Sequence, residues 1–386
     1  MGRMLCALLV MVPTAVYAEE PPGEMQCPAT GSCLAADDTA VVPPTIDISP
    51  LIHSDQHSAL EWDTAAEAVA KACEKWGFFQ AVNHSIPSAL LDGVVSKGRA
   101  MFSLPKTEKV KFKRTKTNAR GWFDDELTKQ TKDWKEGFDV GHVPEPDKAS
   151  DHPSNTVAEG YNQWPGESVP LFKETMDNYY SGAALVAERL LEGVASYLGL
   201  PRRHFAPSFD PHTSYLRLNY YPLCPEPSTL SVNRHTDAGA LTVLLQENGT
   251  TALQVNHRGT GQWVSIPPVD GALTINVGDM LQVWTNDLFV APEHRVLSQK
   301  DHDRFSAPFF YNPAYHADVT PLPVKIEPRA DGLMAGGGLE GRYRPVNWGE
   351  FRLKRFAGDF ADHGEEVQIS HYRLDSSSSI HRSSRK

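Results

Sequence analysis

The sequence predicts a mainly β fold in which a sandwich or barrel core is flanked by helices. Between residues 214 and 311, short β-rich runs are divided by Gly, Pro, Asn and Asp, as in antiparallel sandwiches and barrels. The eight runs are SYLRLNYY, LTVLLQ, TALQV, WVSI, ALTINVG, MLQVWTN, HRVL and RFSAPFFY. Because no helix-length segment is expected between them, a parallel sheet of alternating strands and helices is excluded for this region.

Helical patterns flank the β-rich region on both sides. Upstream, the sequence predicts a short strand at 44–48, a helix at 60–75, a strand in WGFFQAVNH, and helices at 87–104 and 169–198. The lysine-rich stretch PKTEKVKFKRTK fits a solvated face better than a nucleic-acid site, because the chain is acidic overall. Downstream, RYRPVNWGEFRLKRFAGDFADHGEEVQ again has a helical pattern.

These patterns divide the chain into consecutive parts. The predicted division is a signal peptide at 1–18, a linker at 19–43, an α/β region at 44–205, a β core at 211–315, a C-terminal extension with helices at 316–374, and a disordered serine-rich tail at 375–386.

The N-terminus carries the pattern of a targeting signal. Met4 to Val12 is apolar, and Val16, Tyr17 and Ala18 place small residues where a signal peptidase cleaves. We expect the secretory pathway or an organelle if this signal operates, and the cytoplasm if it does not. In an oxidising compartment, Cys27 and Cys33 could pair.

Charge and composition limit the partners. The chain has 386 residues and a net charge of −11, which argues against nucleic-acid binding. No C-x-x-C motif is present, so a cysteine zinc site is not expected. We expect a small-molecule partner and no stable membrane insertion, and the oligomeric state stays open.

Unusual polar residues punctuate the β-rich runs. His235 and Asp237 are expected to open a strand, where residues i and i+2 share a face. His294 begins another run and can be brought beside them when the sheet closes. Two histidines and one carboxylate form the facial triad of non-haem Fe(II) oxygenases, which leaves metal positions open.

A second pair of positions carries groups that suit an acidic ligand. Arg304 and Ser306 share a strand face and can clamp a carboxylate, while Asn219 and Tyr221 supply further donors. Taken singly, His-x-Asp is most often a strand cap and Arg-x-Ser a surface pair. The ordered set N-x-Y, H-x-D, H and R-x-S is far more specific.

With these motifs, the sequence resembles the 2-oxoglutarate- and Fe(II)-dependent dioxygenases of the isopenicillin N synthase-like type. The resemblance spans PTIDIS, WGFFQAVNHSIP, LRLNYYPLCPEP, HTDAGALTVLLQ, INVGDMLQVWTN, EHRV and RFSAPFFYNP. It implies that the core is a double-stranded β-helix, or jelly roll, supported by the N-terminal α/β region and C-terminal helices.

The resemblance also implies the site and its chemistry. His235, Asp237 and His294 match the iron ligands, Arg304 and Ser306 the clamp for 2-oxoglutarate, and Tyr221 and, less firmly, Asn219 its other donors. The implied reaction uses Fe(II), 2-oxoglutarate and O2, with ascorbate as a possible reductant. It couples decarboxylation of 2-oxoglutarate to hydroxylation, desaturation or cyclisation of a small metabolite.

Three alternatives stay open at this point. They are a 2-oxoglutarate-independent oxidase of the same fold, a non-catalytic jelly-roll binding protein, and a zinc hydrolase that uses the same ligands. The substrate is not readable from the sequence. We expect it to contact loops around Arg120–Phe123 and the C-terminal helices.

Overall fold

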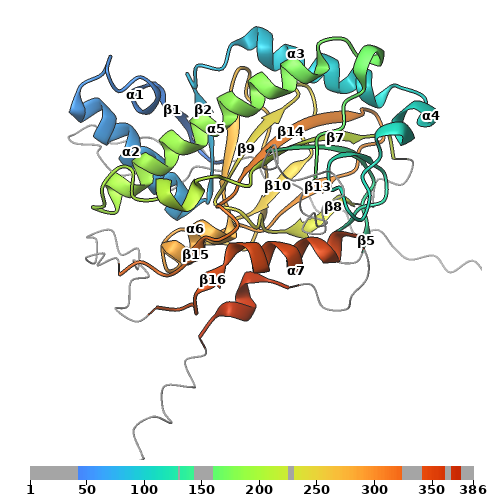
Figure 1. Cartoon of the computed structure of the whole chain (residues 1–386). Helices are drawn as coiled ribbons and strands as arrows, with labels where there is room; N and C mark the ends of the chain where they lie inside the picture. The colour runs from blue at the N-terminus through green and yellow to red at the C-terminus, as the bar shows by residue number, and fades with distance from the viewer. Residues whose placement is uncertain are drawn as a thin grey trace, which may run out of the picture. The chain divides into compact units, whose positions relative to one another are not determined.

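Two β-sheets lie at the centre of the fold (Figure 1). The structure is a computed structural model that describes residues 42–128, 131–142, 160–224, 230–323, 341–360 and 367–374. The major sheet contains β1 (Thr45–Asp47), β2 (Phe78–Val82), β3 (Gly121–Phe123), β6 (Glu136–Gly141), β7 (Tyr215–Tyr221), β9 (Leu241–Gln246), β12 (Leu273–Val277) and β14 (Arg304–Tyr311). The minor sheet contains β8 (Leu230–His235), β10 (Leu253–Asn256), β11 (Trp263–Ser265) and β13 (His294–Leu297).

The strand order identifies a jelly roll. The major sheet runs β1-β2-β12-β9-β14-β7-β6-β3, and the minor sheet runs β11-β10-β13-β8. Side chains from both sheets form one apolar cluster, which includes Phe78 and Leu244 from the major sheet and Leu253 and Val296 from the minor sheet. The predicted fold class, a jelly-roll core with flanking helices, is therefore confirmed.

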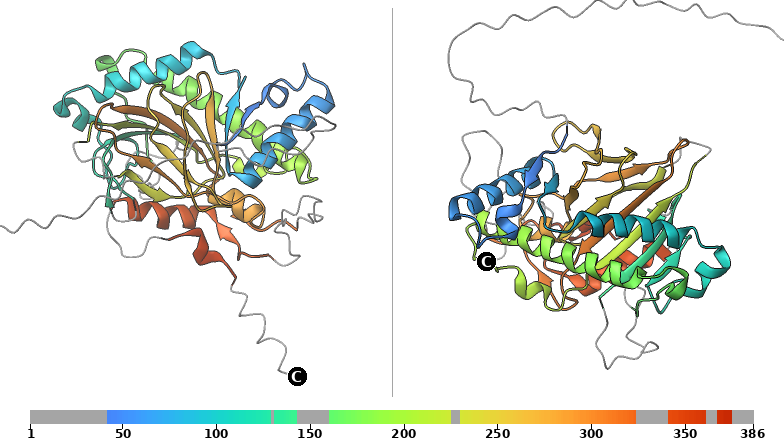
Figure 2. Two further views of the ribbon diagram at one scale, coloured as in Figure 1. Left: turned by 180° about the vertical axis from the view of Figure 1, so that it is seen from behind. Right: turned by 90° about the horizontal axis from the view of Figure 1, so that it is seen from above.

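Helices α2 (Ala59–Lys75), α3 (Ser88–Phe102) and α5 (Phe172–Tyr197) pack on the major sheet, on the face that is turned away from the minor sheet. The other helices are α1 (Ser49–Ile52), α4 (Lys106–Lys109), α6 (Asp279–Trp284) and α7 (Trp348–Phe360). Figure 2 shows α3 and α5 side by side over this sheet. Gly98 of α3 is needed there, because a Cβ would lie 2.3 Å from the Phe305 ring.

Strand β14 shows how one sequence serves two layers. Phe305, Ala307 and Phe309 are buried in the core that contains α3 and α5, whereas Arg304 and Ser306 line a hollow between the sheets. This alternation follows from the two-residue period of a strand. The helix side supplies packing, and the opposite side supplies the polar groups of the site.

The N-terminal region contributes strands to the same sheet. β1 and β2 pair in parallel, with Ile46 opposite Ala81, and α2 connects them. Ser58 caps α2 in a reciprocal capping box with Glu61, which stabilises such a helix by about 1 kcal/mol. This parallel pair lies outside the β-rich region, where the ladders are antiparallel.

Two details of the predicted strands are wrong. MLQVWTN is not a strand, because Asp279–Trp284 form helix α6. All six of its residues are buried, so periodicity cannot separate a strand from a helix here. His235 and Asp237 do not open a strand either: His235 ends β8, and Asp237 lies in the loop before β9.

Some predictions fall outside the described residues. These are the signal peptide at 1–18, nearly all of the linker at 19–43, the pairing of Cys27 with Cys33, and the tail at 375–386. The division into parts stays a prediction. Within the described ranges, no helix combines the length and apolar character needed to cross a membrane.

Candidate active site

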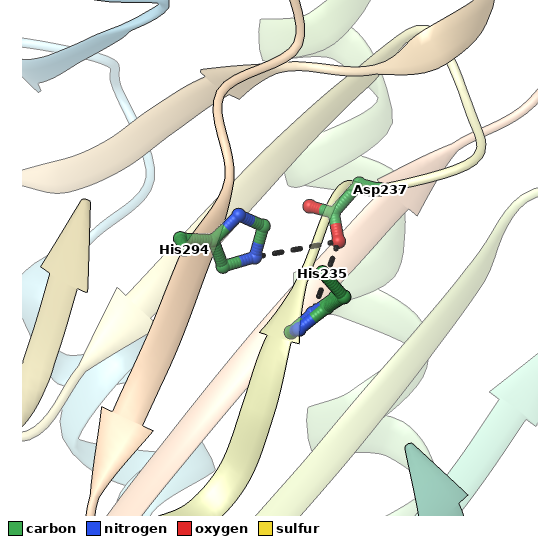
Figure 3. Close-up of side chains that lie close together, drawn as sticks. All are labelled: His235, Asp237 and His294. Carbon is green, nitrogen blue, oxygen red and sulfur yellow. Dashed lines mark ion pairs between the residues drawn. The ribbon is translucent and has the colours of Figure 1, made fainter. Parts of the chain in front are cut away.

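The three predicted metal ligands converge where the two sheets open. His235 is the last residue of β8 and lies opposite His294, the first residue of β13, in the antiparallel ladder. Asp237 lies two residues past His235, and its Oδ1 is 3.7 Å from His235 Nε2 and 3.5 Å from His294 Nε2. Figure 3 shows the two rings and the carboxylate turned toward one point.

Both imidazoles are oriented by the main chain. Nδ1 of His235 lies 2.8 Å from the carbonyl oxygen of Asn233, and Nδ1 of His294 lies 3.1 Å from that of Pro292. Because a carbonyl can only accept, each Nδ1 carries the proton and donates it. Each Nε2 therefore turns its lone pair toward Asp237, as in metal-ligating histidines.

The two oxygens of the Asp237 carboxylate have different partners. Its Oδ2 accepts hydrogen bonds from Thr242 Oγ1 at 2.5 Å and Asn276 Nδ2 at 2.8 Å. These bonds fix the plane of the carboxylate and leave Oδ1 facing the histidines. Outer partners of this kind usually hold a metal-ligating carboxylate in place.

The local electrostatics favour the metal-binding protonation states. Burial, followed by the proximity of His294, lowers the pKa of His235 to about 3. Burial by itself would raise the pKa of Asp237, but the two histidines and the bonds from Asn276 and Thr242 lower it on balance. At neutral pH, His235 is therefore neutral and Asp237 ionised, as metal binding requires.

The donor set fits Fe(II). The ligand atoms of His235, Asp237 and His294 all lie within 4.8 Å of one another, a spacing that one ion can bridge. Two imidazoles and one carboxylate on one side of an ion leave positions for exchangeable ligands, which is typical of non-haem Fe(II) oxygenases.

One hollow beside the triad holds the predicted clamp, and we call it the clamp hollow. It is lined by Arg304, Ser306, Asn219 and Tyr221, together with the three metal ligands. Arg304 pairs with Tyr221 and Ser306 with Asn219 across β14 and β7. The sheet register therefore brings all four predicted residues together.

The clamp hollow also contains polar atoms that lack protein partners. Arg304 is buried; its terminal nitrogens donate to Gln246 Oε1 at 3.0 Å and Ser306 Oγ at 3.3 Å. Among the described residues, Arg304 Nε and Asn219 Oδ1 have no hydrogen-bond partner although they are buried. Buried polar atoms are nearly always satisfied. The Arg304 guanidinium therefore suits an anionic ligand, whereas Asn219 Oδ1 calls for a hydrogen-bond donor.

A second hollow meets the clamp hollow at His235 and Asp237. Its walls carry the aromatic rings of Tyr215, Phe310 and Trp348, and the charged groups of Glu126, Lys135, Arg217 and Arg355. Near the loop expected to contact the substrate, around Arg120–Phe123, Glu126 and Lys135 line this hollow. The substrate contacts themselves stay a prediction. The expected C-terminal contribution comes from α7.

A buried ion-pair network supports this second hollow. Arg217 forms two bonds of 2.8 Å to Asp139 on the neighbouring strand, and a contact of 2.7 Å to Glu126. Lys135 lies 2.7 Å from Glu126 and 3.1 Å from Asp133. The sequence does not reveal this network, since its members are separated in the chain and follow no recognisable motif.

The fold and donor set define a non-haem Fe(II) oxygenase. Residues 212–313 match the 2OG-Fe(II) oxygenase superfamily, and residues 43–167 match the N-terminal region of the non-haem dioxygenases in morphine synthesis. The chain belongs to the 2-oxoglutarate- and Fe(II)-dependent dioxygenases, and it is an oxidoreductase that acts on small organic molecules.

Individual relatives agree with this assignment. Feruloyl CoA ortho-hydroxylase 1 of Arabidopsis thaliana is 35% identical over 75% of this chain and 74% of that protein. Gibberellin 3-beta-dioxygenase 2-1 of Triticum aestivum is 32% identical over 74% of this chain and 75% of that protein. A full-length Neurospora crassa protein, solved in complex with alpha-KG, aligns with a TM-score of 0.69 and 25% identity, covering 84% of this chain and 98% of that one.

Proposed function

We propose that His235, Asp237 and His294 bind the catalytic iron, and that Arg304 and Ser306 hold the distal carboxylate of 2-oxoglutarate. Tyr221 and Asn219 complete the clamp hollow. The observation that carries this proposal is that two adjoining hollows meet at His235 and Asp237 of the triad. Such a site can bring a co-substrate and a substrate to the same ion.

The metal and the protein side chains have different roles in the proposed reaction. Fe(II), with 2-oxoglutarate and O2, supplies the oxidising chemistry that protein side chains lack. Arg304 neutralises the co-substrate carboxylate and fixes its orientation. Phe310 lines both hollows, and Val232 does the same, so their side chains limit the access of water between them.

The substrate we propose is a small organic molecule with a flat aromatic body. The cations Lys135 and Arg217 in the lining of the second hollow are already paired with buried acids, so the aromatic side chains carry the recognition. The rings of Tyr215, Phe310 and Trp348 suit a flat apolar body. An aromatic compound should therefore bind about 2- to 10-fold more tightly than its ring-saturated counterpart, because an aromatic pair is worth about 0.5–1.5 kcal/mol beyond its buried area.

Two measurements test these assignments. Anaerobic addition of Fe(II) and 2-oxoglutarate to the full chain should produce a weak visible charge-transfer band, which His294→Ala should lack. An unchanged band in His294→Ala would overturn the iron assignment. Screening paired aromatic and ring-saturated compounds for stimulated succinate formation tests the substrate class, and equal stimulation by both members would reject it.

A further inference from the structure

We propose that Arg355 is a positioning residue that locks the iron-binding loop into a closed circuit of hydrogen bonds. The loop between β8 and β9 comprises residues 236–240 and contains Asp237. The circuit joins this loop to α6, then to the C-terminal segment 367–374, and back through α7. The inference rests on the assignment of His235 and Asp237 as metal ligands.

The first half of the circuit consists of hydrogen bonds from the start of α6 to the iron-binding loop. The backbone N–H groups of Gly278, Asp279 and Met280 donate to the carbonyls of Ala240, Asp237 and Gly239, at 2.9, 2.8 and 2.9 Å. A Cβ on Gly278 would lie 2.3 Å from the Gly239 carbonyl oxygen, so only glycine permits this approach. The helix therefore holds three of the loop's five carbonyls.

Arg355 holds a fourth carbonyl, that of Thr236 between the two ligands. It lies on α7, the helix at the lower edge of the view in Figure 1, and is buried. One terminal nitrogen donates to the Thr236 carbonyl at 3.1 Å, and the other donates to the Val367 carbonyl at 3.0 Å. Arginine suits this task because its planar fork reaches two acceptors at fixed angles, which lysine cannot reproduce.

The C-terminal segment closes the circuit. Arg373 binds the carboxylate of Asp287 and donates to the Tyr343 hydroxyl at 2.8 Å. Asp287 follows the end of α6, and its backbone N–H donates to the Gln282 carbonyl of that helix at 3.1 Å. The chain between Val367 and Arg373 includes the short helix Ile369–Tyr372. Each link in the circuit is thus a hydrogen bond or a short covalent stretch.

This arrangement makes the metal ligands depend on residues far away in the sequence. Arg355 is more than one hundred residues from Asp237 in the chain, and its bond fixes the peptide that separates the ligands. Without it, α6 still holds one side of the loop, while the Thr236 peptide can rotate. We expect a loss of ligand preorganisation with the clamp hollow left intact.

The test compares Arg355→Gln with Lys354→Gln in the full chain. Lys354 is the adjacent residue on α7, is exposed, and contacts only Glu350 at 4.0 Å among the contacts described for it. Co(II) titration of the metal-free proteins should show affinity weakened about 10- to 100-fold in Arg355→Gln, the range for outer partners of metal ligands. Lys354→Gln should bind Co(II) as the wild type does, and Arg355→Lys should not restore the affinity.

Further variants distinguish a role of Arg355 in positioning the metal ligands from a general contribution to stability. Arg373→Gln should weaken Co(II) binding in the same direction, and the double variant should lose less than the sum of the two, because both residues serve one circuit. Wild-type Co(II) affinity in folded Arg355→Gln would overturn the inference, as would strictly additive losses. His235→Ala is measured alongside: if it retained Co(II), the ligand assignment itself would fail.

Discussion

The clamp hollow and the second hollow share His235 and Asp237 but are built differently. The clamp residues lie on two paired strands, at positions that alternate with core residues. The second hollow collects side chains from Glu126 to Arg355, on loops, strands and a helix. The comparison shows that the register of two paired strands is enough to assemble the clamp, whereas the second hollow depends on the packing of strands, loops and α7.

Two buried arginines of the site use their charges differently. Arg304 lines the clamp hollow, and its Nε has no hydrogen-bond partner among the described residues. Arg217 lines both hollows and is already bound to Asp139 and Glu126. Arg304 is therefore prepared for a charged ligand, whereas Arg217 uses its charge to hold the wall together.

The largest expected effect is the loss of iron affinity and turnover when a ligand that both hollows share is substituted. His235→Ala or Asp237→Ala should lower iron affinity by more than about 100-fold, beyond the 10- to 100-fold loss caused by removing outer partners. Turnover should be lost with it. Iron content and succinate formation measure the effect, and full decarboxylation by either variant would contradict the assignment.

The next largest effect, a loss of folding stability, should follow from removing a buried ion-pairing charge at the second hollow. Arg217→Met should lower the free energy of unfolding by about 3–5 kcal/mol, because it leaves Asp139 and Glu126 as buried acids short of a partner. Chemical denaturation measures this change. A loss below about 1 kcal/mol would show that the network is not a structural support.

In contrast to Arg217→Met, Arg304→Ala should mainly weaken the binding of 2-oxoglutarate and have a smaller effect on stability. The affinity for 2-oxoglutarate should fall by about 10- to 100-fold, since a charge-assisted hydrogen bond is worth about 1.5–3 kcal/mol. Stability should change less than in Arg217→Met, because Arg304 has no ion pair among the described residues. The KM for 2-oxoglutarate and denaturation of the same samples test both halves, and an unchanged KM would indicate a different carboxylate ligand.

The smallest effect concerns pH and the metal-free protein. His235 has a folded pKa of about 3 against an ordinary value of 6.5, so the folded state binds fewer protons and loses stability as pH falls below 6.5. From pH 7 to 5, this group should contribute a loss of about 2 kcal/mol. The melting temperature of His235→Gln should fall less than that of the wild type over this range. Equal falls would mean that burial of His235 does not govern the acid sensitivity.

The site is easier to predict than the element that carries it. The metal ligands can be identified although Asp237 lies in a loop and not on a strand. The structure brings the three predicted residues together because their identity and order define the set, not the strand geometry assumed for it. The sequence of α6 reads as a strand because the helix is buried on all sides, which removes the periodicity that distinguishes helices.

The sequence by itself determined the mainly β core and the residues of the His-Asp-His triad, and it predicted the clamp at Arg304 and Ser306. Strand alternation and the order of the polar motifs carry these inferences, and the family resemblance implied the jelly roll and the residue roles. Tertiary structure alone decided the ion-pair network behind the second hollow and the bond from Arg355 to the Thr236 carbonyl. Those contacts join segments far apart in the chain, so only the packing of the sheets and helices brings their charges and carbonyls within bonding distance.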